Sequence, residues 1–156
     1  MPKIDIDRVP LNRGSSYPEP HASEMSGRGY LRLGDAAGLT PFGANITVLD
    51  PGGVSSMGPG PMTEDEFVMV TEGEVVLVED TGETVMRVGD CAAFPAGVEN
   101  GHHFVNRTET QARFLVIGTR SDHEVAYYSD VDMMVEDKGG VTRFTKRDGT
   151  LLKEIK

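Results

Sequence analysis

Apolar and polar side chains alternate along much of this chain in short runs separated by glycine-rich turns. In residues 42–49, small or branched apolar side chains alternate with asparagine and threonine, and the run ends at the turn sequence Asp-Pro-Gly-Gly of residues 50–53. A two-residue period is typical of strands with one buried face. Similar short runs predict strands at residues 30–34, 66–71, 74–79, 84–88, 91–94, 102–106, 112–119, 124–128, 133–135 and 141–146. Because no segment has a long helical period, we predict an all-β protein.

The two ends of the chain differ from its middle. Residues 1–40 are rich in proline, glycine and charge, which predicts an irregular N-terminal arm with one helical turn near residues 35–39. Residues 41–120 contain most of the predicted strands and are interpreted as a barrel core. Residues 121–156 are interpreted as C-terminal strands and an arm that complete the barrel or form a dimer interface. A length of 156 residues suits one domain.

Composition narrows the classes of partner and the cellular location. Lys and Arg number 15 against 25 Asp and Glu, and the resulting net charge of -10 disfavours binding to nucleic acid or anionic membranes. No apolar run approaches the roughly 20 residues that a membrane-spanning helix needs, and the first residues lack the apolar segment of a signal peptide. We therefore expect a cytoplasmic protein. The single cysteine, Cys91, excludes an internal disulfide and is interpreted as a buried core thiol.

One motif of glycines and a glutamate runs from Gly53 to Gly73. Its spacing resembles the first motif of the cupin family, which reads G-x5-H-x-H-x3-4-E-x6-G. Gly53, Glu66 and Gly73 match that pattern, whereas Pro59 and Pro61 occupy the two histidine positions. The resemblance therefore includes the glycines and the carboxylate but not the imidazoles.

A second motif follows between Gly89 and Asn106. It resembles the second cupin motif, roughly G-x5-P-x-G-x2-H-x3-N, at Gly89, Pro95, Gly97, His102 and Asn106, with two extra residues between Gly97 and His102. Membership of the cupin family implies a jelly-roll β-barrel, also called a double-stranded β-helix, with a mouth at one end. The motifs cover about a third of the chain, and the strand-rich flanks agree with them.

The resemblance also implies a degenerate metal site. In cupins with the full pattern, three histidines and the glutamate hold one divalent ion, such as Mn, Fe, Ni or Zn. Proline has no side-chain lone pair, so only Glu66 and His102 of the four ligand positions remain. Two protein ligands rarely hold a transition metal tightly. We expect no tightly bound metal, with a weakly held divalent ion left open.

Glu66 and His102 are still the candidate catalytic residues, because a carboxylate and an imidazole in an apolar barrel would pair with each other or with a ligand. Strand alternation from these two residues gives further inward positions, and the rigid Pro-Gly-Pro segment at residues 59–61 is flanked by two methionines. The predicted pocket residues are Val68, Val70, Phe104, Asn106, Met57 and Met62. The adjacent His103 is expected to point away from the interior.

Three functional hypotheses follow. The favoured one is a protein that binds a small organic molecule in the barrel lumen. The alternative is a small cupin enzyme of the isomerase, lyase or dioxygenase type, in which Glu66 and His102 act as acid and base or hold a weak metal. A structural or assembly role is the third. Uncovered strand edges and two long arms predict a homodimer.

Overall fold

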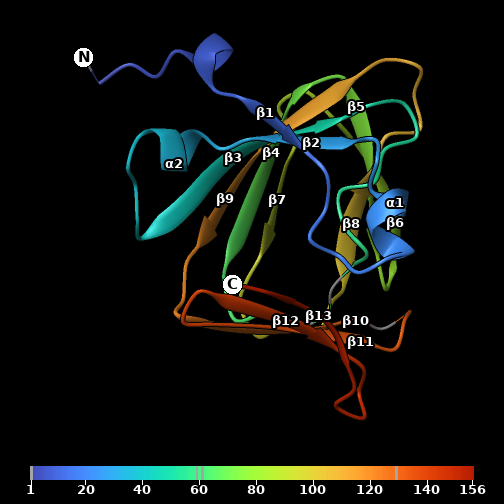
Figure 1. The fold of residues 1–156 in the computed structure, drawn as a ribbon. Helices are drawn as coiled ribbons and strands as arrows, with labels where there is room; N and C mark the ends of the chain where they lie inside the picture. The colour runs from blue at the N-terminus through green and yellow to red at the C-terminus, as the bar shows by residue number, and fades with distance from the viewer. Residues whose placement is uncertain (1, 59, 61, 129) are drawn as a thin grey trace.

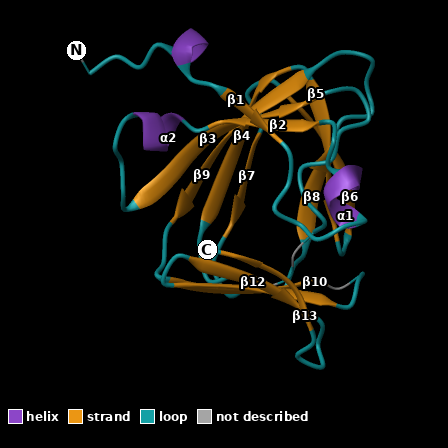
Figure 2. Ribbon diagram, in the orientation of Figure 1, coloured by secondary structure: helices purple, strands orange, loops and turns teal. Residues whose placement is uncertain are grey.

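Two antiparallel sheets face each other and form a barrel (Figures 1 and 2). The computed structural model describes residues 2–58, 60, 62–128 and 130–156. The larger sheet is ordered β1 (Leu11–Arg13), β2 (Arg28–Leu31), β3 (Phe42–Leu49), β9 (Ala112–Thr119), β4 (Glu66–Glu72), β7 (Cys91–Phe94). The smaller sheet is ordered β6 (Gly82–Arg87), β5 (Glu74–Glu79), β8 (His102–Val105). This arrangement confirms the all-β jelly-roll class that the sequence predicted.

Pairing between strands that are distant in the sequence places the candidate residues. β9 pairs with both β3 and β4, so that residues 112–119 join two segments of the larger sheet. Glu66, at the start of β4, lies opposite Phe94 of β7. His102, at the start of β8, lies opposite Glu79 of β5. Glu66 and His102 therefore begin strands of different sheets and approach one another across the barrel.

The two glycines of the first motif are required by backbone geometry. Gly73 has φ 72° in the tight turn between β4 and β5, and a Cβ there would lie 2.9 Å from the Gln111 carbonyl oxygen. A Cβ on Gly53 would lie 2.5 Å from the Gly27 carbonyl oxygen. Neither position has room for a side chain. Gly53 thereby lets the N-terminal segment pass close to the loop that follows β3.

Part of the segment that was interpreted as an N-terminal arm belongs to the barrel. β2 pairs with β3 over four residue pairs, and β1 pairs with β2 at the sheet edge. The remaining elements of this segment are η1 (Ile6–Arg8), α1 (His21–Glu24) and α2 (Leu33–Ala36). The sequence predicts a strand at residues 30–34, which overlaps β2, but it does not indicate β1, because three residues are too few to show alternation.

The C-terminal residues form a separate sheet of four strands: β10 (His123–Tyr128), β11 (Met133–Lys138), β12 (Val141–Thr145) and β13 (Leu151–Ile155). Figure 1 shows this sheet across one end of the barrel. Aromatic packing attaches it to the N-terminal segment. The Tyr17 ring meets Tyr128 and Phe144 edge-on, with centroids 5.6 and 5.8 Å apart. The predicted C-terminal strands therefore close the barrel end as a second layer.

Cys91 is exposed, which corrects the interpretation of a buried thiol. It begins β7, an edge strand of the larger sheet, so that the small residues around it border solvent.

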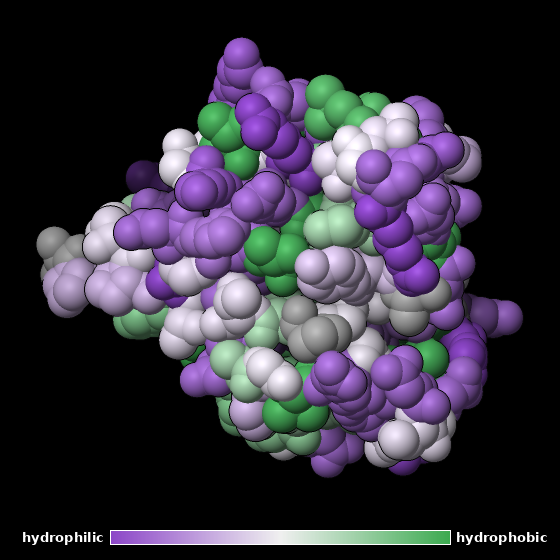
Figure 3. Space-filling model, turned by 90° about the horizontal axis from the view of Figure 1, so that it is seen from below, coloured by the Kyte–Doolittle hydropathy of each residue, from purple (hydrophilic) through white to green (hydrophobic). Residues whose placement is uncertain are grey.

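Figure 3, viewed from below, shows a mainly hydrophilic face with separate apolar groups. Among the described residues, no helix is both long and apolar enough to cross a membrane. The homodimer stays a prediction.

Candidate functional site

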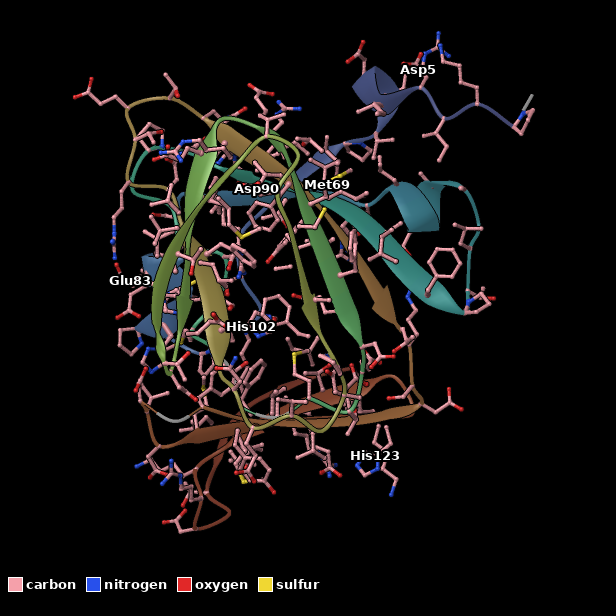
Figure 4. The ribbon with its side chains drawn as sticks, turned by 180° about the vertical axis from the view of Figure 1, so that it is seen from behind. Asp5, Met69, Glu83, Asp90, His102 and His123 are labelled. Carbon is pink, nitrogen blue, oxygen red and sulfur yellow. The ribbon has the colours of Figure 1, made fainter. Side chains whose placement is uncertain are left out.

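A cavity of about 170 Å³ lies in the barrel lumen beside Glu66 and His102. The Nε2 atom of His102 lies 3.0 Å from Oε1 of Glu66. His102 is 7% exposed as a residue, and Figure 4 shows it on β8, in the interior between the barrel sheets. The other lining residues are Tyr30, Thr47, Ser55, Ser56, Met62, Phe104, Phe114 and Val116. The two candidate catalytic residues are thus brought together at the wall of a cavity.

Stacking holds the imidazole of His102 in one orientation. The Phe94 ring lies parallel to it at an interplanar angle of 3°, with centroids 3.5 Å apart. Because Phe94 is opposite Glu66 in the β4–β7 ladder, one strand pair supplies both the stacking ring and the carboxylate. An ionised carboxylate only accepts hydrogen bonds, so Nε2 carries the proton when Glu66 is ionised. Nδ1 of a neutral imidazole then keeps its lone pair.

The structure divides the predicted pocket residues between the cavity and the core. Met62 and Phe104 line the cavity. Val68 and Val70 are buried in the hydrophobic cluster between the sheets, and Met57 packs against the aromatic cluster under the C-terminal sheet. Val68 and Val70 share the predicted face of Glu66, and Met57 was predicted from its place beside the Pro-Gly-Pro segment, but all three side chains pack in hydrophobic clusters.

Asn106 has an architectural role rather than a place in the lumen. Its amide donates to the carbonyl oxygens of Leu49 and Thr110 at 2.9 and 2.8 Å. Its side-chain oxygen accepts a hydrogen bond from the Thr108 backbone N–H at 2.9 Å. With its side chain fully buried and hydrogen-bonded in this way, Asn106 fixes the turn between β8 and β9.

The donors near the lumen do not fit a transition metal. Among the residues that the structure describes, no three His, Cys, Asp or Glu side chains form a group able to hold an ion. His21 pairs with Glu24 and His123 with Glu136, both on the surface, and Figure 4 shows His123 far from His102. Pro59 and Pro61 lie outside the described residues.

A second cavity of about 580 Å³ adjoins the first, and the sequence analysis did not find it. Tyr30, Ser55 and Ser56 line both cavities. Arg28 and Arg32 from the N-terminal segment line the second cavity, together with residues of the C-terminal sheet that include Glu124, Tyr128 and Asp137. We call this second cavity the vestibule. Both ends of the chain form its walls, and nothing in the spacing of these residues indicates that they meet.

Glu124 is an unusual carboxyl group in the vestibule wall. Oε1 of Glu124 is buried and has no hydrogen-bond partner among the described residues. Burial, followed by the negative charges of Glu64, Asp137 and Glu66, raises the pKa of Glu124 to about 7. A carboxylic acid near this pKa can donate a proton at neutral pH.

The raised pKa of Glu124 predicts a pH dependence of stability. Folding retains a proton on Glu124 that the unfolded chain loses above its ordinary pKa of 4.5. Stability from this group is therefore complete below about pH 4.5 and falls as the pH rises through about 7. Thermal unfolding at pH 5 and at pH 8 tests this prediction. The Tm of Glu124→Gln minus the Tm of the wild type should be larger at pH 8 than at pH 5. A difference that is equal at both pH values would contradict the assignment.

Comparisons with known proteins agree with the motifs. Residues 45–118 match the Cupin_2 (cupin domain) family model. A crystal structure from Silicibacter pomeroyi, described as a sugar phosphate isomerase of the cupin superfamily, is 54% identical, with a TM-score of 0.92 and coverage of 97% of each chain. A β-D-galactosidase of Mycobacterium tuberculosis is 34% identical over 118 residues, which are 74% of this chain and 98% of that protein.

A third similarity extends only to the fold. The polyketide cyclase RemF of Streptomyces resistomycificus is 22% identical, with a TM-score of 0.62 and coverage of 76% of this chain and 79% of that one. The family match, the Silicibacter pomeroyi structure and the jelly-roll architecture agree. This chain belongs to the cupin superfamily.

Proposed function

We propose that this protein is an enzyme that transfers protons on a small carbohydrate bound in the barrel lumen. The observation that supports this best is the contact between Glu66 and His102 at the cavity wall, with an Nε2–Oε1 distance of 3.0 Å. A carboxylate and an imidazole in contact are a common acid–base arrangement. The two closer relatives are described as a sugar phosphate isomerase and a β-D-galactosidase, and both descriptions name enzymes that act on carbohydrates.

Aldose–ketose isomerisation is the reaction that this pair suits best. The Glu66 side chain is 23% exposed and that of His102 is 8% exposed, so we assign substrate contact to the carboxylate. Glu66 accepts the proton from C2 of the open-chain aldose, and the C–H electron pair forms the C1–C2 double bond of an enediol as O1 gains a proton from solvent. Glu66 then returns its proton to C1, and O2 loses its proton to solvent, which yields the ketose. His102 donates through Nε2 and holds the carboxylate in place.

Glycoside hydrolysis is a second candidate, because two carboxyl groups with different environments face adjoining cavities. Glu124, with its pKa raised to about 7 by burial, would give its proton to the glycosidic oxygen as the C–O bond breaks. Glu66 would take a proton from the water that adds to the anomeric carbon. Both carboxyl groups would then have changed protonation state once, and proton exchange with solvent restores them.

One experiment separates these candidates. Purified protein is incubated in D₂O with glucose 6-phosphate, ribose 5-phosphate, glucose and galactose, and separately with p-nitrophenyl β-D-galactoside in ordinary buffer. Deuterium incorporation at C1 or C2, seen by NMR and lost in His102→Ala, supports isomerisation. Release of nitrophenol that depends on Glu124 supports hydrolysis. If neither reaction occurs above background, the enzymatic proposal is wrong.

The same variant tests whether the protein only binds its ligand. A binding protein without catalysis should lose affinity in His102→Ala and should show no turnover in the wild type. An enzyme should lose kcat, because the removed imidazole orients the base that acts in the transition state. Glu136→Gln is a matched surface control for Glu66, because Glu136 also pairs with a histidine, His123, but far from the lumen.

A further inference from the structure

Arg28 is a buried cation at the edge of the vestibule. The residue is 5% exposed and begins β2. Its guanidinium carbon lies 4.9 Å from the centre of the Tyr30 ring and 5.8 Å from that of Tyr17. One guanidinium nitrogen, Nη1, donates to the Ser55 carbonyl oxygen. These contacts hold the guanidinium group at the junction of the vestibule and the lumen.

Among the residues that the structure describes, no carboxylate lies within ion-pairing distance of Arg28, and its Nε atom is buried without a hydrogen-bond partner. A buried charge without a counter-ion is costly, and two aromatic faces offset only part of that cost. In a chain with net charge -10, the absence of a carboxylate at this position indicates a place for an anion from solution.

Neighbouring groups support the same conclusion. Arg32 also lines the vestibule and forms no ion pair with the described residues, whereas the charge of Arg13 is balanced by Asp50 at 2.8 Å. The Tyr30 hydroxyl, whose pKa burial raises to about 12, donates a long hydrogen bond of 3.4 Å to the Ser55 carbonyl oxygen, the same atom that accepts from Arg28. Ser55 and Ser56 line both cavities. Hydroxyls and a guanidinium together are the usual donors to an oxyanion.

Two acidic groups face the same cavity from the C-terminal sheet. Asp137 accepts a hydrogen bond from the Thr142 hydroxyl at 3.0 Å, and Glu124 is partly protonated near neutral pH. Arg28 and Arg32 line the same cavity from the N-terminal segment, so the repulsion would be weakest for an anion held close to these two cations.

We infer that Arg28 binds an oxyanion of the substrate, the phosphate of a phosphorylated sugar or the carboxylate of an acidic sugar, while the sugar carbons enter the lumen beside Glu66. This inference rests on the proposed function and names the substrate class for it. The lumen cavity of about 170 Å³ is smaller than the vestibule of about 580 Å³, and the three shared residues join the two. A substrate with a carbon chain and a charged end therefore fits the pair of cavities better than a neutral sugar does.

Calorimetric titration tests the inference without turnover. The probes are inorganic phosphate, ribose 5-phosphate, glucuronate and uncharged ribose, each added to the full chain. We expect binding of ribose 5-phosphate or glucuronate and at least tenfold weaker binding of ribose. Loss of the charge–charge hydrogen bonds in Arg28→Gln should weaken anion binding by about 10- to 100-fold. The preference between ribose 5-phosphate and glucuronate identifies the anion as phosphate or carboxylate.

Two further variants keep the test decisive if Arg28→Gln does not fold. Arg28→Lys retains the charge but loses the planar guanidinium group, and Arg32→Gln removes an exposed cation of the same cavity. Each should weaken anion binding severalfold. Arg107→Gln is the control, because Arg107 is exposed and its ion-pair partner is Glu83 of β6. This variant should leave anion binding unchanged. The inference is overturned if the wild type binds neither anion, or if both Arg28→Lys and Arg32→Gln bind like the wild type.

The two proposals fail in different ways. Anion binding that depends on Arg28, without turnover of any probe, would preserve this inference and contradict the enzymatic proposal. Turnover of uncharged sugars without anion binding would preserve the enzymatic proposal and contradict the inference about Arg28.

Discussion

The Glu66→Gln variant is expected to lose kcat by about 10²- to 10⁴-fold, the range typical of removing a general base. Glutamine keeps the size of the side chain and can still hydrogen-bond to His102, but it cannot accept a proton from carbon. KM for the same substrate should change by only a few fold, because the contacts that bind the sugar remain. Steady-state kinetics with the substrate found by deuterium exchange measures both constants.

Two comparisons show whether the loss in Glu66→Gln comes from chemistry. Glu72→Gln removes a carboxylate on the same strand whose partner is Arg113 at the surface, and it should leave kcat unchanged. His102→Gln keeps a hydrogen-bond donor toward Glu66, so it should retain more activity than His102→Ala. Equal kcat in Glu66→Gln and the wild type would remove the carboxylate from the mechanism.

Replacing Phe144 by Ala is expected to lower the free energy of unfolding by about 3–5 kcal/mol, the usual cost of deleting a fully packed aromatic ring. Phe144 is 2% exposed and lies in the cluster with Tyr17, Met25, Tyr128 and Met133. That cluster joins the C-terminal sheet to the N-terminal segment, so its loss should loosen the vestibule wall. Urea unfolding followed by circular dichroism gives the free energy.

Leu151→Ala is the matched control for Phe144→Ala. Leu151 lies in β13 of the same sheet and is 55% exposed, so its truncation should cost about 0.5 kcal/mol or less. If both variants lost the same free energy, Phe144 would not be the residue that anchors the sheet.

The sequence predicted the barrel well because its signals are local. Alternation and turn residues indicated the run from β3 to β12, with strand ends shifted by a few residues at most. The motif glycines Gly53 and Gly73 occupy positions where a Cβ would collide with backbone, and such a constraint is visible in a sequence. β13 was missed because its sequence, LLKEI, does not alternate in polarity.

The candidate site was predictable only in part. Glu66 and His102 were found because they occupy ligand positions of the two cupin-like motifs, and strand alternation from them supplied the further pocket residues. Alternation does not say how deep along the strand a cavity extends, so Val68 and Val70 were placed in the pocket although they fill the core. The vestibule was missed because Arg28 and Glu124 are almost a hundred residues apart and meet only through tertiary packing.

Within the part of the chain that the structure describes, the C-terminal sheet shares no strand ladder with the barrel, although its residues line part of the vestibule. Its attachment consists of the aromatic cluster, a few loop contacts such as the hydrogen bond from the Gly60 N–H to the Tyr127 carbonyl oxygen, and the connecting chain. Substitutions on its inner face can therefore change which molecules enter without disturbing the hydrogen bonds that keep the barrel closed. Glu124 and Asp137 can thus tune what the vestibule admits from a sheet separate from the two barrel sheets, whereas Arg28 does so from within β2 of the barrel itself.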